Sequence, residues 1–140
     1  MKFDNEQFTE IAFIFEKENN YNHSEFEKNV IQNSELKDID LVELEEMIVR
    51  GIENGIYVDK FERVNAYWTL SKRYNFKLIP KFKCWLKNEL ESEMENSIPI
   101  YQILIALDYL NEPVFAENRF SRDSAEIELN IRDAKNYLKE

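Results

Sequence analysis

The sequence predicts an all-α fold, and three observations lead to that prediction. Residues 98–110 are apolar almost all the way round a helix, so neighbouring helices must surround this segment. The chain of 140 residues contains only two glycines and three prolines, which favours long helices over a fold with many turns. Apolar residues also recur in helix pairs with a period near 40 residues. We therefore expect one all-helical domain, residues 1–140.

Two helices are predicted in the first part of the chain. Between residues 4 and 18, apolar side chains recur with the spacing i, i+3, i+4, i+7 and share one face; they are Phe8, Ile11, Ala12 and Phe15. A shorter helix is expected from 24 to 33, because Ser24 and Glu27 form a capping-box pattern at its start.

The remaining helices are predicted from similar apolar spacing at residues 40–54, 60–74, 76–90, 98–110 and 124–138. Acidic capping pairs mark the starts of some of them, namely Asp40 with Glu43, Asp59 with Glu62 and Asp123 with Glu126. Gly55 and Asn75 predict helix ends. Residues 111–122 are expected to form the longest irregular stretch.

An internal repeat relates these helices. A shift of 40 residues places Val64, Ala66, Tyr67 and Leu70 on Leu104, Ala106, Leu107 and Leu110. A shift of 38 residues places Leu41, Leu44, Met47, Ile48 and Ile52 on Ile79, Phe82, Trp85, Leu86 and Leu90. Helix pairs with a period near 40 are typical of helical-repeat arrays.

Three segments of this region, Arg63–Leu70, Leu78–Phe82 and Ala106–Pro113, resemble the HEAT repeat consensus. That consensus has a small Ala and a Leu in the second helix of each pair, and an Ile/Val-Pro start to the first helix. The resemblance covers about residues 40–113 and implies a HEAT-like α-α superhelix of antiparallel helix pairs, about six to seven helices in all. It says little about activity, because solenoids are scaffolds. An irregular helical bundle is the alternative.

The resemblance also implies that the second helices of the pairs line a concave face. The side of these helices opposite Ala66 and Ala106 is rich in aromatic residues, as expected of a protein-binding patch. This aromatic strip comprises Phe61, Asn65, Trp68, Thr69, Lys72, Tyr101, Ile105, Asp108 and Tyr109. The alternative is that neighbouring helices cover the strip.

Charge is distributed unevenly along a chain whose net charge is −10. Residues 1–60 contain 15 acidic and 6 basic residues, whereas residues 61–140 contain 13 acidic and 12 basic residues. An acidic protein repels nucleic acid and attracts basic partners. We therefore expect no nucleic-acid binding, and a basic protein partner that approaches the acidic residues Asp38, Asp40, Glu43, Glu45, Glu46 and Glu53.

The sequence contains no pattern that indicates catalysis. His23 has no second histidine or cysteine near it and is expected to face solvent, and Cys84 is expected to be structural. Glycine-rich phosphate loops and known hydrolase or metal-binding motifs are absent. We therefore predict no catalytic residues, no metal and no cofactor. The acidic start of the chain and the lack of a long apolar run predict a cytoplasmic protein without a membrane span.

These observations together favour a non-enzymatic protein-binding module. Its specific form would be an immunity protein of a bacterial toxin–immunity pair, because the segment from Leu110 to Leu138 is similar to uncharacterised families of that class. One alternative is a scaffold or adaptor in a larger assembly, as a monomer or a homodimer. Another is a small enzyme whose carboxylates meet in a concave groove.

Overall fold

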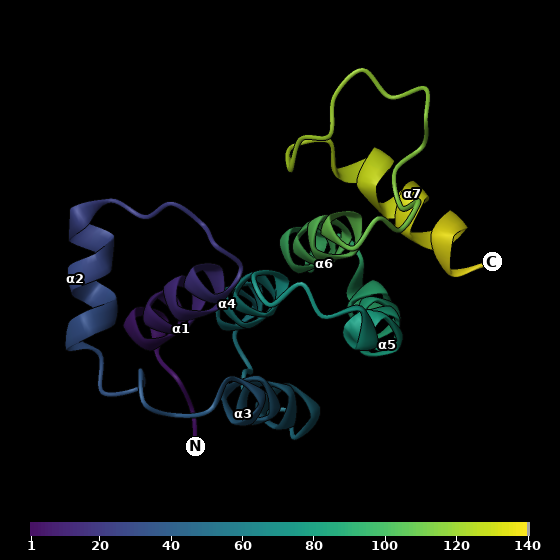
Figure 1. The fold of residues 1–140 in the computed structure, drawn as a ribbon. Coiled ribbons are helices and arrows are strands. Elements are labelled where there is room, and N and C mark those ends of the chain that lie inside the picture. Colours follow the sequence, from purple (N-terminus) through teal and green to yellow (C-terminus); the bar gives the residue numbers. More distant parts are fainter. Residues whose placement is uncertain (140) are drawn as a thin grey trace. The chain divides into compact units, whose positions relative to one another are not determined.

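The computed structural model describes residues 1–139 and shows an all-α protein (Figure 1). Its seven α-helices are α1 (Asn5–Glu18), α2 (Glu25–Asn33), α3 (Leu41–Glu53), α4 (Lys60–Ser71), α5 (Ile79–Glu89), α6 (Ser97–Tyr109) and α7 (Ile127–Leu138). Two short 3₁₀ helices, η1 (Phe76–Leu78) and η2 (Leu90–Ser92), flank α5. The chain divides into an N-terminal unit that ends at Arg73 and a C-terminal unit that begins at Tyr74. That it forms one domain stays a prediction.

In the N-terminal unit, α4 packs against both α1 and α3, and α2 packs against α1. The core contains aromatic and aliphatic side chains from three helices, including Phe8, Ile11, Phe15, Leu44, Ile48, Ala66 and Leu70. Tyr57 is also buried, and its Oη accepts a hydrogen bond from the Phe3 N–H at 3.1 Å. Gly51 makes room for this ring, because a Cβ there would lie 2.7 Å from Tyr57 Cε2. The phenol thus fixes the N-terminal segment against the end of α3.

In the C-terminal unit, α6 packs against both α5 and α7. Five of its side chains are completely buried, namely Ile100, Ile103, Leu104, Ala106 and Leu107. α6 is therefore the central helix of the C-terminal unit, as the apolar character of residues 98–110 favours; a central place in the whole chain stays a prediction.

Three of the predicted helix ends follow their sequence signals, whereas α4 ends at Ser71, before the end predicted at Asn75. Ser24 and Asp59 each cap a helix in a complete capping box with the glutamate three residues on. Gly55 has φ of +71° just beyond α3, as expected of a glycine that ends a helix. Asp40 stands at the start of α3, but its side chain makes no capping hydrogen bond, so the predicted capping box is absent there.

The last helix starts later than predicted. It begins at Ile127, whereas the sequence predicted a start near residue 124. The reason is that the Glu126 carboxylate accepts hydrogen bonds from the Asp123 N–H at 2.9 Å and the Ser121 hydroxyl at 2.8 Å. The Asp123–Glu126 pair therefore organises a turn before the helix.

Burial matches the register of the predicted repeat at most positions; the exceptions are Val64 and Met47, which are half-buried where Leu104 and Trp85 are buried. Ala66 and Ala106 are both completely buried, and Leu70 and Leu110 are both buried. In the first helices of the pairs, the equivalent residues Leu44 and Phe82 are completely buried, as are Ile48 and Leu86; Leu41, Ile52, Ile79 and Leu90 are all half-buried. The structure is compatible with a helical-repeat fold in which α4 and α6 hold corresponding places.

Candidate protein-binding surfaces

Five of the six predicted acidic residues are exposed, namely Asp38, Asp40, Glu43, Glu46 and Glu53. We call these five the acidic surface. Arg50 lies among them, with its guanidinium 3.2 Å from Glu43 and 3.7 Å from Glu46. The surface therefore keeps an excess of negative charge.

Glu45 was wrongly included in this surface. It is buried, because it follows Leu44 on the side of α3 that packs against α4. Its carboxylate lies 3.4 Å from Arg73 Nε, beyond the end of α4. Glu45 thus belongs to the packing of the N-terminal unit.

The first half of the aromatic strip lies on α4 and is partly covered by α1. Thr69 is completely buried, which corrects its place in the strip; its hydroxyl donates to the Phe8 carbonyl at 3.3 Å. Asn65 donates to Asn5 Oδ1 at 2.6 Å, also across to α1. Lys72 and Trp68 are half-buried, with the ammonium over the indole ring. Only Phe61 is exposed, at 54%.

The second half of the strip lies on α6, where residues 111–126 reach over part of it. The Tyr101 hydroxyl donates to the Arg122 carbonyl at 2.9 Å. The Arg122 guanidinium in turn lies 3.6 Å from Asp108 Oδ1. Tyr109 is exposed at 39% and stacks on Tyr74, with ring centroids 6.0 Å apart, while Ile105 is half-buried. Polar contacts within the chain therefore occupy much of this face.

A buried ionic cluster holds the irregular segment 111–126 against α7. The Arg119 guanidinium donates to Asn130 Oδ1 at 2.8 Å, to Asp133 Oδ2 at 3.0 Å and to Glu126 Oε1 at 3.0 Å. The side chains of Arg119 and Asp133 are each only 2% exposed. Asp133 also accepts the Ala116 N–H at 3.1 Å. The contacts of this Arg119 cluster hold the segment in place, although it has no regular secondary structure.

Phe120, the next residue, is fully exposed. Arg119 fixes the backbone on one side of it. On the other side, Arg122 stacks over the Phe115 ring at 5.1 Å and pairs with Asp108. A large apolar side chain is therefore presented to solvent from a segment whose neighbours are held in place. This exposed ring was not predicted from the sequence, where the available signal was an aromatic residue between two arginines in an otherwise irregular stretch.

Acid should weaken the Arg119 cluster through Asp133. Burial opposes ionisation of this carboxyl, but hydrogen bonds from the Ala116 N–H, Arg132 and Arg119 outweigh burial and hold its pKa below the ordinary value. The resulting stabilisation is present in full above the ordinary aspartate pKa of about 4 and is lost as the pH falls through the lower pKa of the folded state.

We therefore expect the urea midpoint of the wild type to fall on acidification more steeply than that of Asp133→Asn. Urea denaturation of both proteins at neutral pH and at a series of acidic pH values measures the difference. Equal pH dependence in the two proteins would contradict the contribution assigned to Asp133.

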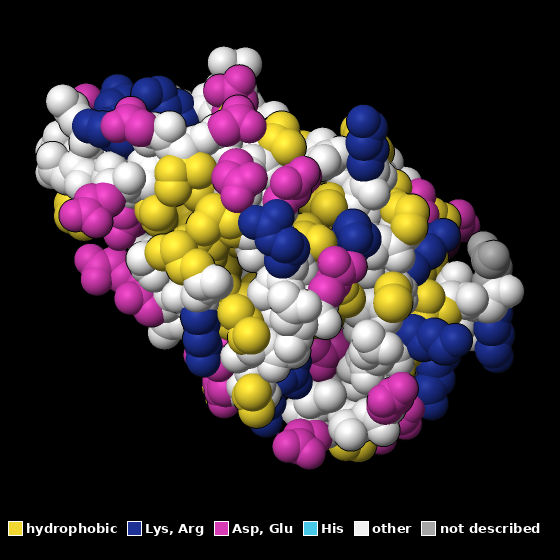
Figure 2. Space-filling view, turned by 90° about the horizontal axis from the view of Figure 1, so that it is seen from below, with side chains coloured by type: hydrophobic (Ala, Val, Ile, Leu, Met, Phe, Trp, Pro, Cys, Tyr) yellow, Lys and Arg dark blue, Asp and Glu magenta, His cyan; other side chains and the backbone are white. Residues whose placement is uncertain are grey.

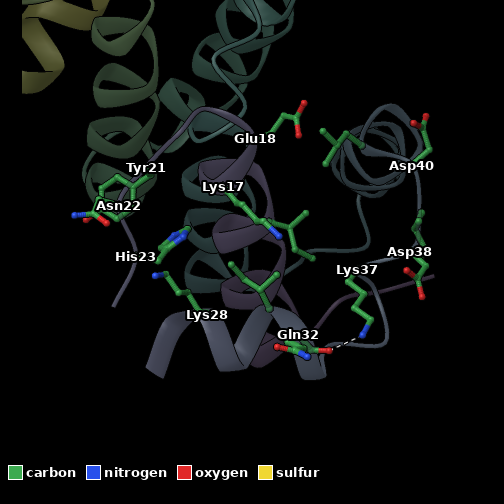
Figure 3. A pocket seen from close by; sticks show the side chains of 14 residues that line it. Lys17, Glu18, Tyr21, Asn22, His23, Lys28, Gln32, Lys37, Asp38 and Asp40 are labelled. Atoms are coloured by element: carbon green, nitrogen blue, oxygen red, sulfur yellow. Dashed lines mark hydrogen bonds between the residues drawn. The ribbon is translucent and has the colours of Figure 1, made fainter. Parts of the chain in front are cut away.

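A cavity of about 740 Å³ opens in the N-terminal unit between α1, α2 and the segment before α3 (Figure 3). Its apolar lining comes from Ile14, Ile31, Ile39 and Leu41. Two residues of the acidic surface, Asp38 and Asp40, also line it. Figure 2 shows hydrophobic side chains gathered over the helices of this unit, with charged side chains at the edges of the patch. The sequence analysis did not predict this cavity.

Two side chains that were considered for chemistry lie in unexpected environments. His23 is buried rather than facing solvent; its Nε2 lies 3.2 Å from Glu16 Oε1, and the rings of Tyr21 and Phe13 flank it. Cys84 is exposed on α5 and is not packed in the core, contrary to its predicted structural role. His23 belongs to the loop between α1 and α2, and its ring packs back against Phe13 and Glu16 of α1.

Within residues 1–139, no three His, Cys, Asp or Glu side chains converge as a metal-binding group. No helix in this described part is long and apolar enough to cross a membrane. Comparison of the chain with protein families, with curated proteins and with solved structures finds no match.

Proposed function

We propose that this protein is a non-enzymatic protein-binding module, and specifically an immunity protein that binds and occludes a cognate bacterial toxin. The observation that carries the proposal is the fully exposed Phe120 beside the buried Arg119 cluster. Aromatic side chains that fill a partner's pocket supply much of the energy of many interfaces. Phe120 is suited to that role.

Preorganisation strengthens this interpretation. Binding costs free energy when a flexible segment must be ordered, and a segment that is already fixed avoids that cost. The hydrogen bonds of Arg119 and the Arg122 contacts with Phe115 and Asp108 hold the chain on both sides of Phe120. The ring itself makes no contribution to the core, so folding stability does not explain its presence.

The acidic surface on α3 supports a basic partner. Exposed carboxylates speed the encounter with a positively charged protein and make the association rate dependent on salt. Nuclease toxins are positively charged in order to bind nucleic acid, and they would be partners of this kind. In this proposal, charge guides the encounter and Phe120 anchors the complex.

Phe120→Ala is expected to weaken the complex with the product of the neighbouring upstream gene about tenfold or more. Surface plasmon resonance with the two purified proteins measures the affinity and both rate constants. The free energy of unfolding should stay unchanged, because the ring is fully exposed. Phe26→Ala is the matched control, since Phe26 is also a strongly exposed phenylalanine, at 75%, on α2. Equal losses in the two variants, or no complex at all, would argue against the proposal.

The scaffold alternative and the enzyme alternative predict different results. A scaffold built through self-association would elute as a dimer in size-exclusion chromatography with light scattering, and Phe120→Ala would shift it to a monomer. An enzyme needs facing carboxylates with a raised pKa. In the Arg119 cluster, hydrogen bonds from the Asp123 N–H and the Ser121 hydroxyl instead lower the pKa of Glu126. This observation favours a structural role for the cluster.

A further inference from the structure

The cavity in the N-terminal unit has the size and lining of a small-molecule site. Its volume of about 740 Å³ is within the range of known ligand pockets. One part of the lining is aliphatic, with Ile14 and Ile31 buried and Ile39 half-buried. An aliphatic surface of this kind favours an apolar body of a ligand, because contact removes apolar area from water.

Basic groups lie beside this aliphatic surface. Two of them already have partners, since Lys37 Nζ donates to the Gln32 carbonyl at 2.6 Å and Lys28 Nζ lies 3.4 Å from Glu25. Lys17 differs, because its side-chain ammonium group makes no hydrogen bond or ion pair with the described residues. Figure 3 shows its ammonium group among the side chains of the cavity. Lys17 is therefore the positive group that remains for a ligand.

Two of the three acidic groups in the lining point away from Lys17. Glu18, Asp38 and Asp40 border the cavity, but Figure 3 shows the carboxylates of Glu18 and Asp40 pointing away from Lys17. A ligand on Ile14 and Ile31 would thus meet an ammonium group before it meets a carboxylate. This arrangement favours an anionic ligand over a cationic one.

We propose that this cavity binds a small amphipathic monocarboxylate. Its aliphatic body would lie on Ile14 and Ile31, and its carboxylate would pair with the Lys17 ammonium. The proposal is independent of Phe120 and the protein partner, so either one can fail without the other.

The test uses three probes that share one aliphatic body, namely decanoate, decanol and decylammonium, each kept below the concentration at which it forms micelles. Isothermal titration calorimetry with the full chain measures their affinities. Decanoate should bind saturably and about threefold or more tighter than decanol, the size expected of one exposed ion pair. Decylammonium should bind most weakly. No saturable binding of decanoate, or equal affinities for the three probes, would overturn the proposal.

Two variants locate the site. Lys17→Met keeps the aliphatic stem and should abolish the preference for decanoate over decanol. Lys87→Met is its control, because Lys87 is an exposed lysine of α5 that does not line the cavity. Ile39→Trp should fill the cavity and weaken decanoate about tenfold, with circular dichroism as the check of folding. An unchanged preference in Lys17→Met would overturn the pairing even if Ile39→Trp failed to fold.

Discussion

Replacing Arg119 with methionine is expected to lower the free energy of unfolding by about 3–5 kcal/mol. The substitution removes a guanidinium whose side chain is only 2% exposed. Asp133, equally buried, loses one of its two arginine partners and keeps Arg132, whose guanidinium lies 2.9 Å from Asp133 Oδ1. Asn130 and Glu126 lose a donor at the same time. A buried carboxylate that loses one partner keeps the cost of desolvation and loses part of the compensating attraction. Urea denaturation of the full chain, followed by circular dichroism, measures the change.

Arg122→Met is the matched control for this experiment. Arg122 is about half exposed, and its guanidinium lies 3.6 Å from Asp108, so its loss should cost less than about 1 kcal/mol. The double variant Arg119→Met with Asp133→Leu should recover part of the stability, because it removes both buried charges together. If Arg119→Met and Arg122→Met lowered the free energy of unfolding by similar amounts, burial would not explain how much the Arg119 cluster stabilises the fold.

The parts of the fold that depend on neighbouring residues were predictable from the sequence. Apolar spacing located six of the seven α-helices within residues 1–139, since residues three and four positions apart share a helix face. Ser24 and Asp59 fixed two helix starts, because a capping side chain acts on backbone groups two or three residues away. The arrangement of the helices is compatible with the predicted repeat, and the register itself stays a prediction.

The parts that depend on tertiary contacts were not predictable in this way. Glu45 lies between the exposed Glu43 and Glu46 in sequence, yet its side chain is buried on the packed side of α3 and pairs with Arg73. Thr69 lies on the predicted strip, but α1 covers it. The contact is made with Phe8, which precedes Thr69 by 61 residues. Arg119 and Asp133 are separated by a turn and a helix start, so no local spacing relates them. Long-range pairing decided each of these cases.

The candidate sites follow the same division. The acidic surface was predicted from the excess of acidic residues over residues 1–60, because charged side chains remain exposed unless another element covers them. The cavity depends on how α2 and the segment before α3 lie around α1, and this placement has no sequence pattern of its own. Phe120 was missed for a related reason. The sequence does not indicate that a phenylalanine in an irregular segment is exposed. The structure shows both its exposure and the contacts that hold the residues on either side of it.

The repeat predicts matched costs for truncation at equivalent core positions. Ile48 in α3 and Leu86 in α5 are both completely buried, and each substitution by alanine should lower the free energy of unfolding by about 2–5 kcal/mol. The equivalent pair Ile52 and Leu90 is half-buried, so alanine there should cost about half as much or less. Urea denaturation of the four variants measures the order. A cavity left in a packed core costs more free energy than one open to water. In each helix, therefore, the buried position should cost more than the half-buried one. A large cost at Leu90 with a small one at Leu86 would mean that the 38-residue register does not describe how these helices pack.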